Sequence, residues 1–184
     1  MRANGVSLWL VPEGPEAQAT TALIGELSAR FGTPSFLPHV TLLGGLAVDA
    51  ATAVERARAL ASTLRDFSVR FEGLEHSADY FRALIVRVAP DLPVLDARRR
   101  AQMAFPSEPV GPFVPHLSLL YGSLPVETRR HLAAEVRESA PEAMVLSRLD
   151  VVATEGLTSE WRLLARLPLS PARDASESVS ATER

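Results

Sequence analysis

The chain has 184 residues, which is enough for one substantial domain or for two small lobes that share a core. Hydrophobic residues make up 47% of it and charged residues 22%, and the formal net charge of −3 provides no strong basic field for a long nucleic acid. Cysteine and lysine are both absent, which excludes disulfides, thiolate chemistry, a Walker-type phosphate lysine and a Schiff base.

The N-terminal segment contains one short apolar run, residues 6–11, which predicts a buried strand and stops at Pro12. This run is too short for the core of a signal peptide followed by a cleavage site, and no stretch of the chain is apolar for long enough to span a bilayer. We therefore expect a cytoplasmic protein that has no membrane partner.

The rest of the chain alternates between short apolar runs and segments with helical spacing. We predict strands over residues 6–11, 36–43, 67–74, 80–88, 113–120, 144–153 and 161–167, with Gly44 and Gly45 ending the second. We predict helices over residues 15–31, from an N-cap at Asp49 to Leu64, over residues 92–103, and from Pro125 to Glu138. This alternation favours an α+β protein of two related lobes, with mostly antiparallel sheets and helices outside.

The last residues of the chain, 170–184, contain almost nothing that a core could bury. Segments of this kind cannot offset the entropy lost on ordering. We therefore predict a disordered C-terminal tail over residues 170–184 and a single two-lobed domain over residues 1–169.

One stretch occurs twice in the chain, as FLPHVTLL at residues 36–43 and as FVPHLSLL at residues 113–120. The two copies are 77 residues apart, which is too long for a solenoid repeat and about the size of a lobe. The non-apolar features that both copies retain are one imidazole and, two residues later, one hydroxyl.

This spacing has a structural consequence in a strand. Side chains two residues apart share a face, so His39 lies beside Thr41 and His116 lies beside Ser118. If the two lobes bring these faces together, the two imidazoles can act as general base and general acid, and the hydroxyls can donate to non-bridging oxygens. Such a site suits in-line displacement at the phosphorus of a cyclic phosphate, and either histidine could be the base.

The competing interpretations of these and other polar residues are weaker. Metal binding is disfavoured because neither stretch has a carboxylate or thiol beside its histidine. The remaining histidines, His76 and His131, are expected to be solvated. Arg82 and Arg148 could meet a phosphate but are more simply structural, and residues 98–100, all arginine, predict a solvated helix face because consecutive side chains spread around a helix.

The segments PHVTLLGG and PHLSLLYG resemble the paired H-x-[ST]-x motifs of the 2H phosphoesterase superfamily. Within it, the chain looks most like the cyclic phosphodiesterase family of plants and yeast. The resemblance extends up to the tail and includes SLWLVPEG near the N-terminus, Tyr80-Phe81 before an apolar strand, and EWRLLARLPL near the end. It implies a bilobal 2H phosphoesterase-like fold with the active site in the cleft between the lobes.

The resemblance also implies roles for particular residues. His39 and His116 would be the acid/base pair, with His116 activating water and His39 protonating the departing oxygen. Thr41 and Ser118 would bind the phosphate, and Tyr121, which follows the second motif, would contact the phosphate or another part of the ligand.

Three further aromatic residues, Trp9, Tyr80 and Phe81, match aromatic positions of the resembled family. They could sandwich a base or a ribose of the substrate. For each of them, packing in the core is the alternative.

The expected function is metal-independent hydrolysis of a small cyclic phosphate, either a 2′,3′-cyclic nucleotide or ADP-ribose 1″,2″-cyclic phosphate. We expect a monomer that needs no cofactor and whose partner is the small-molecule substrate. One alternative is a 2′-5′ RNA ligase-like phosphoesterase that acts on RNA ends, which the modest acidity of the chain disfavours. Another is a non-catalytic module that senses a cyclic phosphate or nucleotide in the same cleft.

Overall fold

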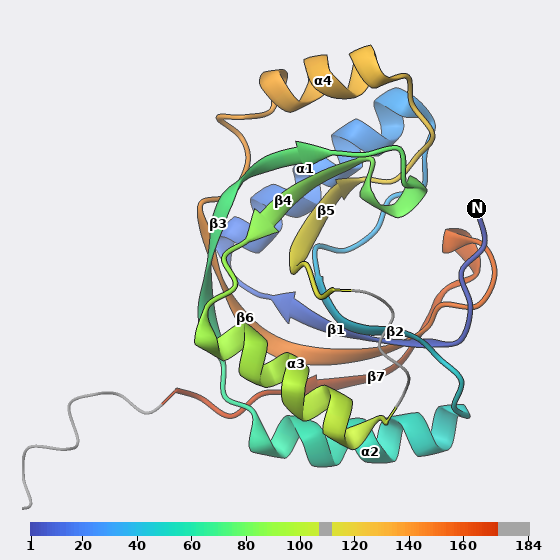
Figure 1. Ribbon diagram of the computed structural model, residues 1–184, viewed down its shortest axis with the longest axis vertical. Helices are drawn as coiled ribbons and strands as arrows, with labels where there is room; N and C mark the ends of the chain where they lie inside the picture. Colours follow the sequence, from blue (N-terminus) through green and yellow to red (C-terminus); the bar gives the residue numbers. More distant parts are fainter. Residues whose placement is uncertain (107–111, 173–184) are drawn as a thin grey trace, which may run out of the picture.

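The computed structural model describes residues 1–106 and 112–172 (Figure 1). Its strands are β1 (Val6–Pro12), β2 (Val40–Leu46), β3 (Phe67–His76), β4 (Leu84–Val88), β5 (His116–Leu120), β6 (Ala143–Ala153) and β7 (Arg162–Pro168). Its helices are α1 (Pro15–Phe31), α2 (Ala50–Thr63), α3 (Leu92–Ala104) and α4 (Val126–Glu135), with the 3-10 turns η1 (Tyr80–Arg82) and η2 (Thr158–Glu160). These elements confirm the predicted mixture of strands and helices.

The ends of two helices follow from local sequence signals. Asp49 caps α2 as predicted, because its carboxylate accepts a hydrogen bond from the backbone N–H of Thr52 at 3.0 Å. Gly32 ends α1 in the left-handed conformation, with a φ of 62° that glycine adopts without a steric penalty. Helix α4 stops at Glu135, three residues before the predicted end.

Three predicted strands have wrong boundaries, and one of them, β5, begins at His116 rather than at residue 113. Tyr80 and Phe81 do not enter a strand but form η1, because the carboxylate of Asp79 accepts from the N–H of Phe81 at 3.0 Å and starts a turn. The second strand begins at Val40 and continues through the glycine pair to Leu46. The glycines do not end it because β1 pairs with this end of β2.

The seven strands form one antiparallel sheet with the order β1-β2-β5-β4-β3-β6-β7, and β1 also pairs with β6. The strands β1, β2, β5, β4, β3 and β6 therefore close a ring, with β7 on the outer side of β6. The start of β6 pairs with β3, and the rest of β6 pairs with β1 and β7. We call β1, β2, β7 and most of β6 the first lobe, and β3, β4 and β5 the second lobe.

Helices cover the outside of both lobes, as predicted. Helices α2 and α3 pack on the first lobe, whereas α1 and α4 pack on the second (Figure 1). The lobes do not correspond to consecutive halves of the chain, because α1 leaves β1 in the first lobe and packs against β5 in the second. Similarly, α3 follows β4 of the second lobe but packs against β2 of the first.

The repeat of the sequence extends to the whole order of elements. The series β1-α1-β2-α2-β3 is followed by the series β4-α3-β5-α4-β6, and α3 begins at Leu92, 77 residues after the start of α1 at Pro15. Strands β1 and β4 correspond to each other, because β1 pairs with β2 and β6 as β4 pairs with β5 and β3, and β7 is the strand without a counterpart. The first helix of each series packs on the motif strand of the other series, α1 on β5 and α3 on β2, so the two repeats interlace.

One hydrophobic core cluster includes buried residues from both lobes. Fully buried leucines of β1, β4, β5 and β6 contribute to it, among them Leu8, Leu84, Leu117 and Leu149. Burying each such side chain stabilises the fold by about 1.5–3 kcal/mol relative to leaving it exposed. The two lobes therefore share a core.

Residues 170–172 lie against the segment that connects α2 to β3. Ser170 exchanges backbone hydrogen bonds with Leu64 and Asp66, and the N–H of Ala172 donates to the carboxylate of Asp66 at 2.6 Å. The remainder of the predicted tail, residues 173–184, lies outside the described residues. In the part of the chain that the structure describes, no helix is both long and apolar enough to cross a membrane.

Candidate active site

The two copies of the repeated stretch meet at a single bridge between β2 and β5. Val40 and Leu117 are antiparallel partners there, and both side chains have no exposed surface. Because side chains alternate along a strand, burying these two residues in the core turns the residues on either side of them to the opposite face. Burial of the apolar residues of the repeat thus orients its polar side chains.

The register at this bridge interleaves the four polar residues. With Val40 opposite Leu117, the antiparallel register places His39 opposite Ser118 and Thr41 opposite His116. Each histidine is therefore the register partner of the hydroxyl residue of the other copy. The structure brings together the four residues that the sequence motifs single out.

Both imidazoles are oriented by the same kind of hydrogen bond. Nδ1 of His39 lies 2.7 Å from the carbonyl oxygen of Leu37, and Nδ1 of His116 lies 2.8 Å from that of Val114. A carbonyl oxygen can only accept, so Nδ1 carries the proton in each ring and Nε2 of the neutral ring is unprotonated. The proline between each histidine and its acceptor restricts the backbone of the accepting residue to extended conformations.

His39 is enclosed by aromatic side chains. It is 5% exposed, and its ring stacks on Trp9 with 3.8 Å between ring centroids and 12° between planes. Its Nε2 lies 3.4 Å from the hydroxyl oxygen of Tyr121. Burial lowers the pKa of His39 to about 4, against the opposing effect of the Leu37 carbonyl. His39 is therefore neutral near pH 7.

His116 is half-buried and has charged neighbours. Burial lowers the pKa of His116, and the carbonyl of Val114 opposes this. The positive charges of Arg82 and Arg87 lower the pKa of His116 further, whereas the carboxylate of Asp79 raises it. The same motif thus places its second imidazole in a charged, partly solvated environment.

The hydroxyl groups of the site have different partners. Tyr121 stacks on Phe36 with 3.8 Å between ring centroids, and burial raises the pKa of Tyr121, so its hydroxyl keeps a proton to donate to His39. Ser118 donates to the backbone carbonyl of Phe81 at 2.9 Å. The Thr41 hydroxyl makes no hydrogen bond to any described residue and lines the cavities described next.

Two cavities flank the paired motifs. The first, which we call the aromatic cavity, has a volume of about 350 Å³ and is lined by His39, Trp9, Phe81, Tyr121 and Trp161, with Ser7 and Thr154 among its polar residues. The second, which we call the arginine cavity, has a volume of about 210 Å³ and is lined by His116, Arg82, Arg98, Phe113 and Val114. Thr41 and Gly44 line both cavities, so the two are adjacent at the motif strands.

Of the three aromatic residues expected to hold a base or ribose, only two line the aromatic cavity. Trp9 and Phe81 line the aromatic cavity together with Tyr121. Tyr80 lies outside the residues that line it and packs edge to face on Phe81, with 5.1 Å between ring centroids. Its carbonyl accepts a backbone hydrogen bond from Gly122. The structure thus places Tyr80 behind Phe81.

Two aromatic residues of the site were missed from the sequence. Phe36 supports Tyr121 by stacking, and Trp161 packs edge to face on Trp9 with 5.7 Å between ring centroids. Phe36 belongs to the repeated stretch, where its sequence pattern indicates only a place in the apolar frame. The chain has only two tryptophans and two tyrosines, and all four lie in this cluster. That scarcity was the one available signal.

Arg98 corrects the expectation that residues 98–100 form a solvated helix face. Its guanidinium lies over the ring of Phe113, 4.9 Å from the centroid, and its Nη1 donates to the carbonyl of Leu42. Arg99 and Arg100 instead pair with Asp96 of the same helix, each at 2.6 Å. The difference arises because α3 packs on β2 along the side that carries Arg98.

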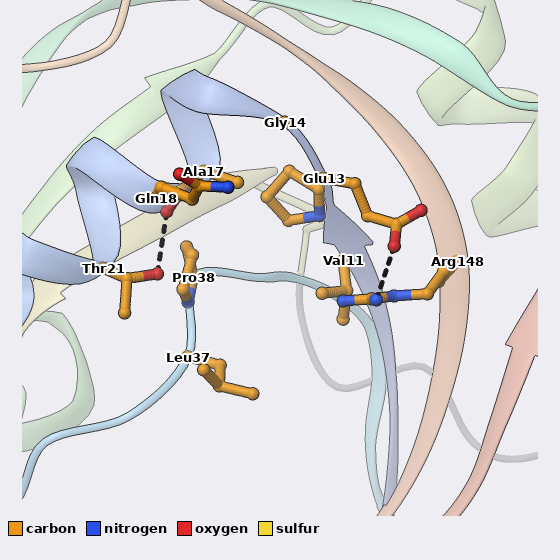
Figure 2. Close-up of a pocket in the computed structure, with 10 residues that line it drawn as sticks. Val11, Glu13, Gly14, Ala17, Gln18, Thr21, Leu37, Pro38 and Arg148 are labelled. Carbon is orange, nitrogen blue, oxygen red and sulfur yellow. Dashed lines mark hydrogen bonds and ion pairs between the residues drawn. The ribbon is translucent and has the colours of Figure 1, made fainter.

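Arg148, a possible phosphate contact by sequence, lies in a separate cavity of about 240 Å³ beside the start of α1 (Figure 2). Its Nη1 pairs with the Glu13 carboxylate at 2.6 Å, so its charge is already neutralised there. The cavity is also lined by Leu37 and Pro38, the two residues before the first motif histidine. Neither motif histidine lines it.

The remaining polar residues singled out from the sequence lie away from the paired motifs or at their edge. His131 is largely exposed and lies 4.0 Å from Glu135, and His76 is half-buried at the end of β3. Arg82 lines the arginine cavity and pairs with Asp79 at 2.7 Å. Over residues 1–106 and 112–172, no group of three or more histidine or acidic side chains could hold a metal ion.

Comparison with known proteins shows which family the chain resembles. The family model described as "Cyclic phosphodiesterase-like protein" matches residues 3–169. A curated relative, the "Cyclic phosphodiesterase" of Arabidopsis thaliana, is 23% identical over 125 residues, which cover 68% of this chain and 69% of the relative.

Solved structures with the same fold have low sequence identity. Escherichia coli LigT in complex with 3′-AMP aligns with a TM-score of 0.56 and 15% identity, covering 92% of this chain and 98% of that one. The Thermus thermophilus protein TT0787 aligns with a TM-score of 0.57 and 15% identity, covering 94% of this chain and 100% of that one.

Proposed function

This chain belongs to the cyclic phosphodiesterase-like family, within the 2H phosphoesterase superfamily, and is a phosphodiesterase; we propose that it hydrolyses a small cyclic phosphate by two-histidine acid/base catalysis without a metal ion. The proposed substrates are a 2′,3′-cyclic nucleotide or ADP-ribose 1″,2″-cyclic phosphate. His39 and His116 are the proposed acid/base pair, and Thr41, Ser118 and Tyr121 the proposed phosphate ligands.

The observation that carries this proposal is the interleaving of imidazoles and hydroxyls across the β2–β5 bridge. In-line displacement at phosphorus requires a base on the attacking side, an acid on the leaving side and donors to the non-bridging oxygens. Two Nε2 atoms and two hydroxyls on one face supply these groups. A five-membered cyclic phosphate suits the site because its ring oxygen leaves readily only if it is protonated as it departs.

The proposed mechanism assigns one histidine to each of the two proton transfers. His116 Nε2 takes a proton from water as the water oxygen forms its bond to phosphorus. His39 Nε2 gives a proton to the ring oxygen as the bond from phosphorus to that oxygen breaks. The product is a phosphomonoester with a free hydroxyl beside it, and the two histidines recover their protonation states by exchange with solvent.

The low pKa of His39 bears on its proposed role as the acid. At about 4 it leaves the imidazole neutral before substrate binds. An anionic cyclic phosphate within a few ångströms favours the protonated imidazole and raises the pKa of His39. The Tyr121 hydroxyl can keep its contact with the ring through this change, because a hydroxyl can donate to the neutral Nε2 and accept from the protonated one. His39 is therefore proposed to acquire its proton with the substrate.

The aromatic cavity is the proposed site for the nucleoside part of the substrate. Trp9 and Phe81 expose ring surface to it, and Ser7 and Thr154 add hydroxyl groups. Base and ribose rings bind well to such surfaces by stacking and hydrogen bonding. The crystal structures of Escherichia coli LigT with 3′-AMP, ATP and NADP+ support a small nucleotide as the ligand of this fold.

The decisive experiment is a panel of cyclic phosphates assayed with EDTA present and with products identified by phosphorus NMR. The panel contains the four 2′,3′-cyclic nucleotides, ADP-ribose 1″,2″-cyclic phosphate and an RNA with a 2′,3′-cyclic end. We expect turnover of at least one small compound, and none by the double variant His39→Ala/His116→Ala. Turnover of the RNA alone would favour an enzyme acting on RNA ends. Tight binding with no product over hours would instead favour a non-catalytic binding module.

A further inference from the structure

The arginine cavity lies on the His116 side of the paired motifs. Its lining includes two guanidinium groups, those of Arg82 and Arg98, and no carboxylate among the described residues. Arg82 is already paired with Asp79, whose carboxylate lies 2.7 Å from Nη2 of Arg82. The positive character of the cavity therefore depends mainly on Arg98.

Arg98 is held in place before any ligand binds. The Phe113 ring supports the flat guanidinium at 4.9 Å, and the Leu42 carbonyl accepts from its Nη1. A guanidinium has five N–H donors in a rigid fork, so this anchoring leaves others to face a ligand. A side chain fixed in this way loses little conformational entropy when it binds an anion.

The charge of Arg98 has no acidic partner in residues 1–106 and 112–172. The side chain is half-buried, and this partial loss of solvent lowers the pKa of Arg98. Arg99 and Arg100 on the same helix both pair with Asp96. An anion in the cavity would supply the compensating charge that Arg98 lacks in the described structure.

The two cavities differ in charge but share a border. The aromatic cavity is lined by no arginine and no acidic residue, whereas the arginine cavity is lined by two arginines. Thr41 and Gly44 line both. A substrate whose reacting phosphorus lies at Thr41 can therefore extend into an aromatic environment on one side and into a cationic one on the other.

We propose that the arginine cavity binds a second, non-reacting phosphate of the substrate and that Arg98 is the main residue selecting for it. The preferred substrates are then cyclic phosphates that carry an additional monophosphate or diphosphate elsewhere in the molecule. This inference rests on the proposed function, because it assumes that the reacting phosphate lies between the two motif histidines.

The test compares matched substrates that differ only in this second phosphate. Adenosine 2′,3′-cyclic phosphate is assayed beside the same compound with a 5′-monophosphate or a 5′-diphosphate. We expect kcat/KM to be roughly 10- to 100-fold higher for the better of the two phosphorylated compounds, as a charge-assisted contact to arginine would give. Most of this gain should appear in KM, because the contact is made equally in the ground state and the transition state.

Three variants assign the gain to Arg98. Arg98→Gln should abolish most of the preference while retaining turnover of the compound without a 5′-phosphate, which also shows that the variant is folded. Arg98→Lys should retain part of the preference because it keeps the charge but loses the planar fork. Arg99→Gln is the matched control, since Arg99 is the next residue on α3 and pairs with Asp96 outside the cavity.

The outcomes separate this inference from the proposed function. Equal kcat/KM for all three compounds, or an equal loss on all of them in Arg98→Gln, would overturn the second-phosphate site. Failure of the wild-type protein to hydrolyse any cyclic phosphate would instead contradict the proposed function. Calorimetry with the same three compounds tests the cavity in that case too, because an Arg98-dependent gain in affinity does not require turnover.

Discussion

The two motif histidines have nearly identical flanking sequences but very different environments. His39 is enclosed by Trp9 and Tyr121, whereas His116 is half-buried and lies near the charge of Arg82. Both rings keep the same Nδ1 contact to a carbonyl two residues earlier. The repeated residues therefore set the position and tautomer of each imidazole, and the residues outside the repeat set its affinity for a proton.

The origin of the difference lies in two places where the repeat is broken. Trp9 lies on β1 opposite Thr41, whereas the corresponding strand β4 has Ile85 opposite Ser118. Tyr121 occupies the position that corresponds to Gly44 in the first copy. The large side chain of Tyr121 fills the space beside His39, and the absence of a side chain at Gly44 keeps the border between the two cavities open.

The largest expected effect is one that the two histidines share. His39→Ala and His116→Ala should each lower kcat on a cyclic nucleotide by about 100- to 10,000-fold, since each removes one partner of an acid/base pair. Steady-state kinetics with EDTA present measures this. His131→Ala, at an exposed position on α4, is the control and should keep full activity. Full activity in either motif variant would contradict the assignment of that histidine to the acid/base pair.

The pH dependence of stability should distinguish the two histidines. A folded-state pKa of about 4 for His39, against about 6.5 in the unfolded chain, means that the unfolded state binds protons first as the pH falls. Stability is then lost between about pH 6.5 and pH 4, by up to about 3 kcal/mol from His39 alone.

Urea denaturation at several pH values measures this loss. The slope of stability against pH should become shallower in His39→Gln, and less so in His116→Gln because His116 is less buried. Equal changes in the two variants would show that the environments do not differ as described.

The hydroxyl groups should also be unequal. Thr41→Val should lower kcat by roughly 100-fold, as expected for the loss of one donor to the charged oxygens of the transition state. Ser118→Ala should cost less, about 10-fold, because its hydroxyl already donates to the Phe81 carbonyl and must leave that bond to reach a phosphate. A larger loss for Ser118→Ala would reverse this ranking.

The smallest expected effect concerns the contact between Tyr121 and His39. Tyr121→Phe removes a hydrogen bond that favours the neutral imidazole, so the pKa of His39 should rise by less than about one unit. The stack on Phe36 is kept, so stability should change little. NMR titration of the histidine ring protons measures the rise. An unchanged titration of His116 is the internal control, and an equal shift at both rings would contradict a local contact.

Much of this architecture could be predicted from the sequence because the repeat encodes it directly. The period-2 alternation around His39 and His116 predicts which side chains share a face, and helix signals such as Asp49 predict the ends of elements. The sequence also leads to the expectation that the polar faces of the two motif strands meet at one site, but not that these strands pair directly. The structure confirms the antiparallel, two-lobed arrangement and brings the four motif residues together.

Other features depend on contacts that no local pattern encodes. Arg98 differs from Arg99 only in the side of α3 on which it lies, and that side matters only because α3 packs on β2 rather than on the lobe it follows. Trp161 joins the aromatic cavity from the loop between η2 and β7, far from both motifs in the chain. Tyr80 lies outside the predicted strand because the Asp79 carboxylate accepts a hydrogen bond from the N–H of Phe81 and starts the turn η1.

The interlaced helices have a consequence for how such a chain could arise. A half-length ancestor with only one series of elements would have its first helix and its motif strand, but no second strand for that helix to cover. Two copies that exchanged their helices would satisfy each other, as in a domain-swapped dimer. One imidazole per copy means that acid/base catalysis would begin only on dimerisation, and gene fusion would then have made the pairing permanent while freeing each half to acquire different neighbours.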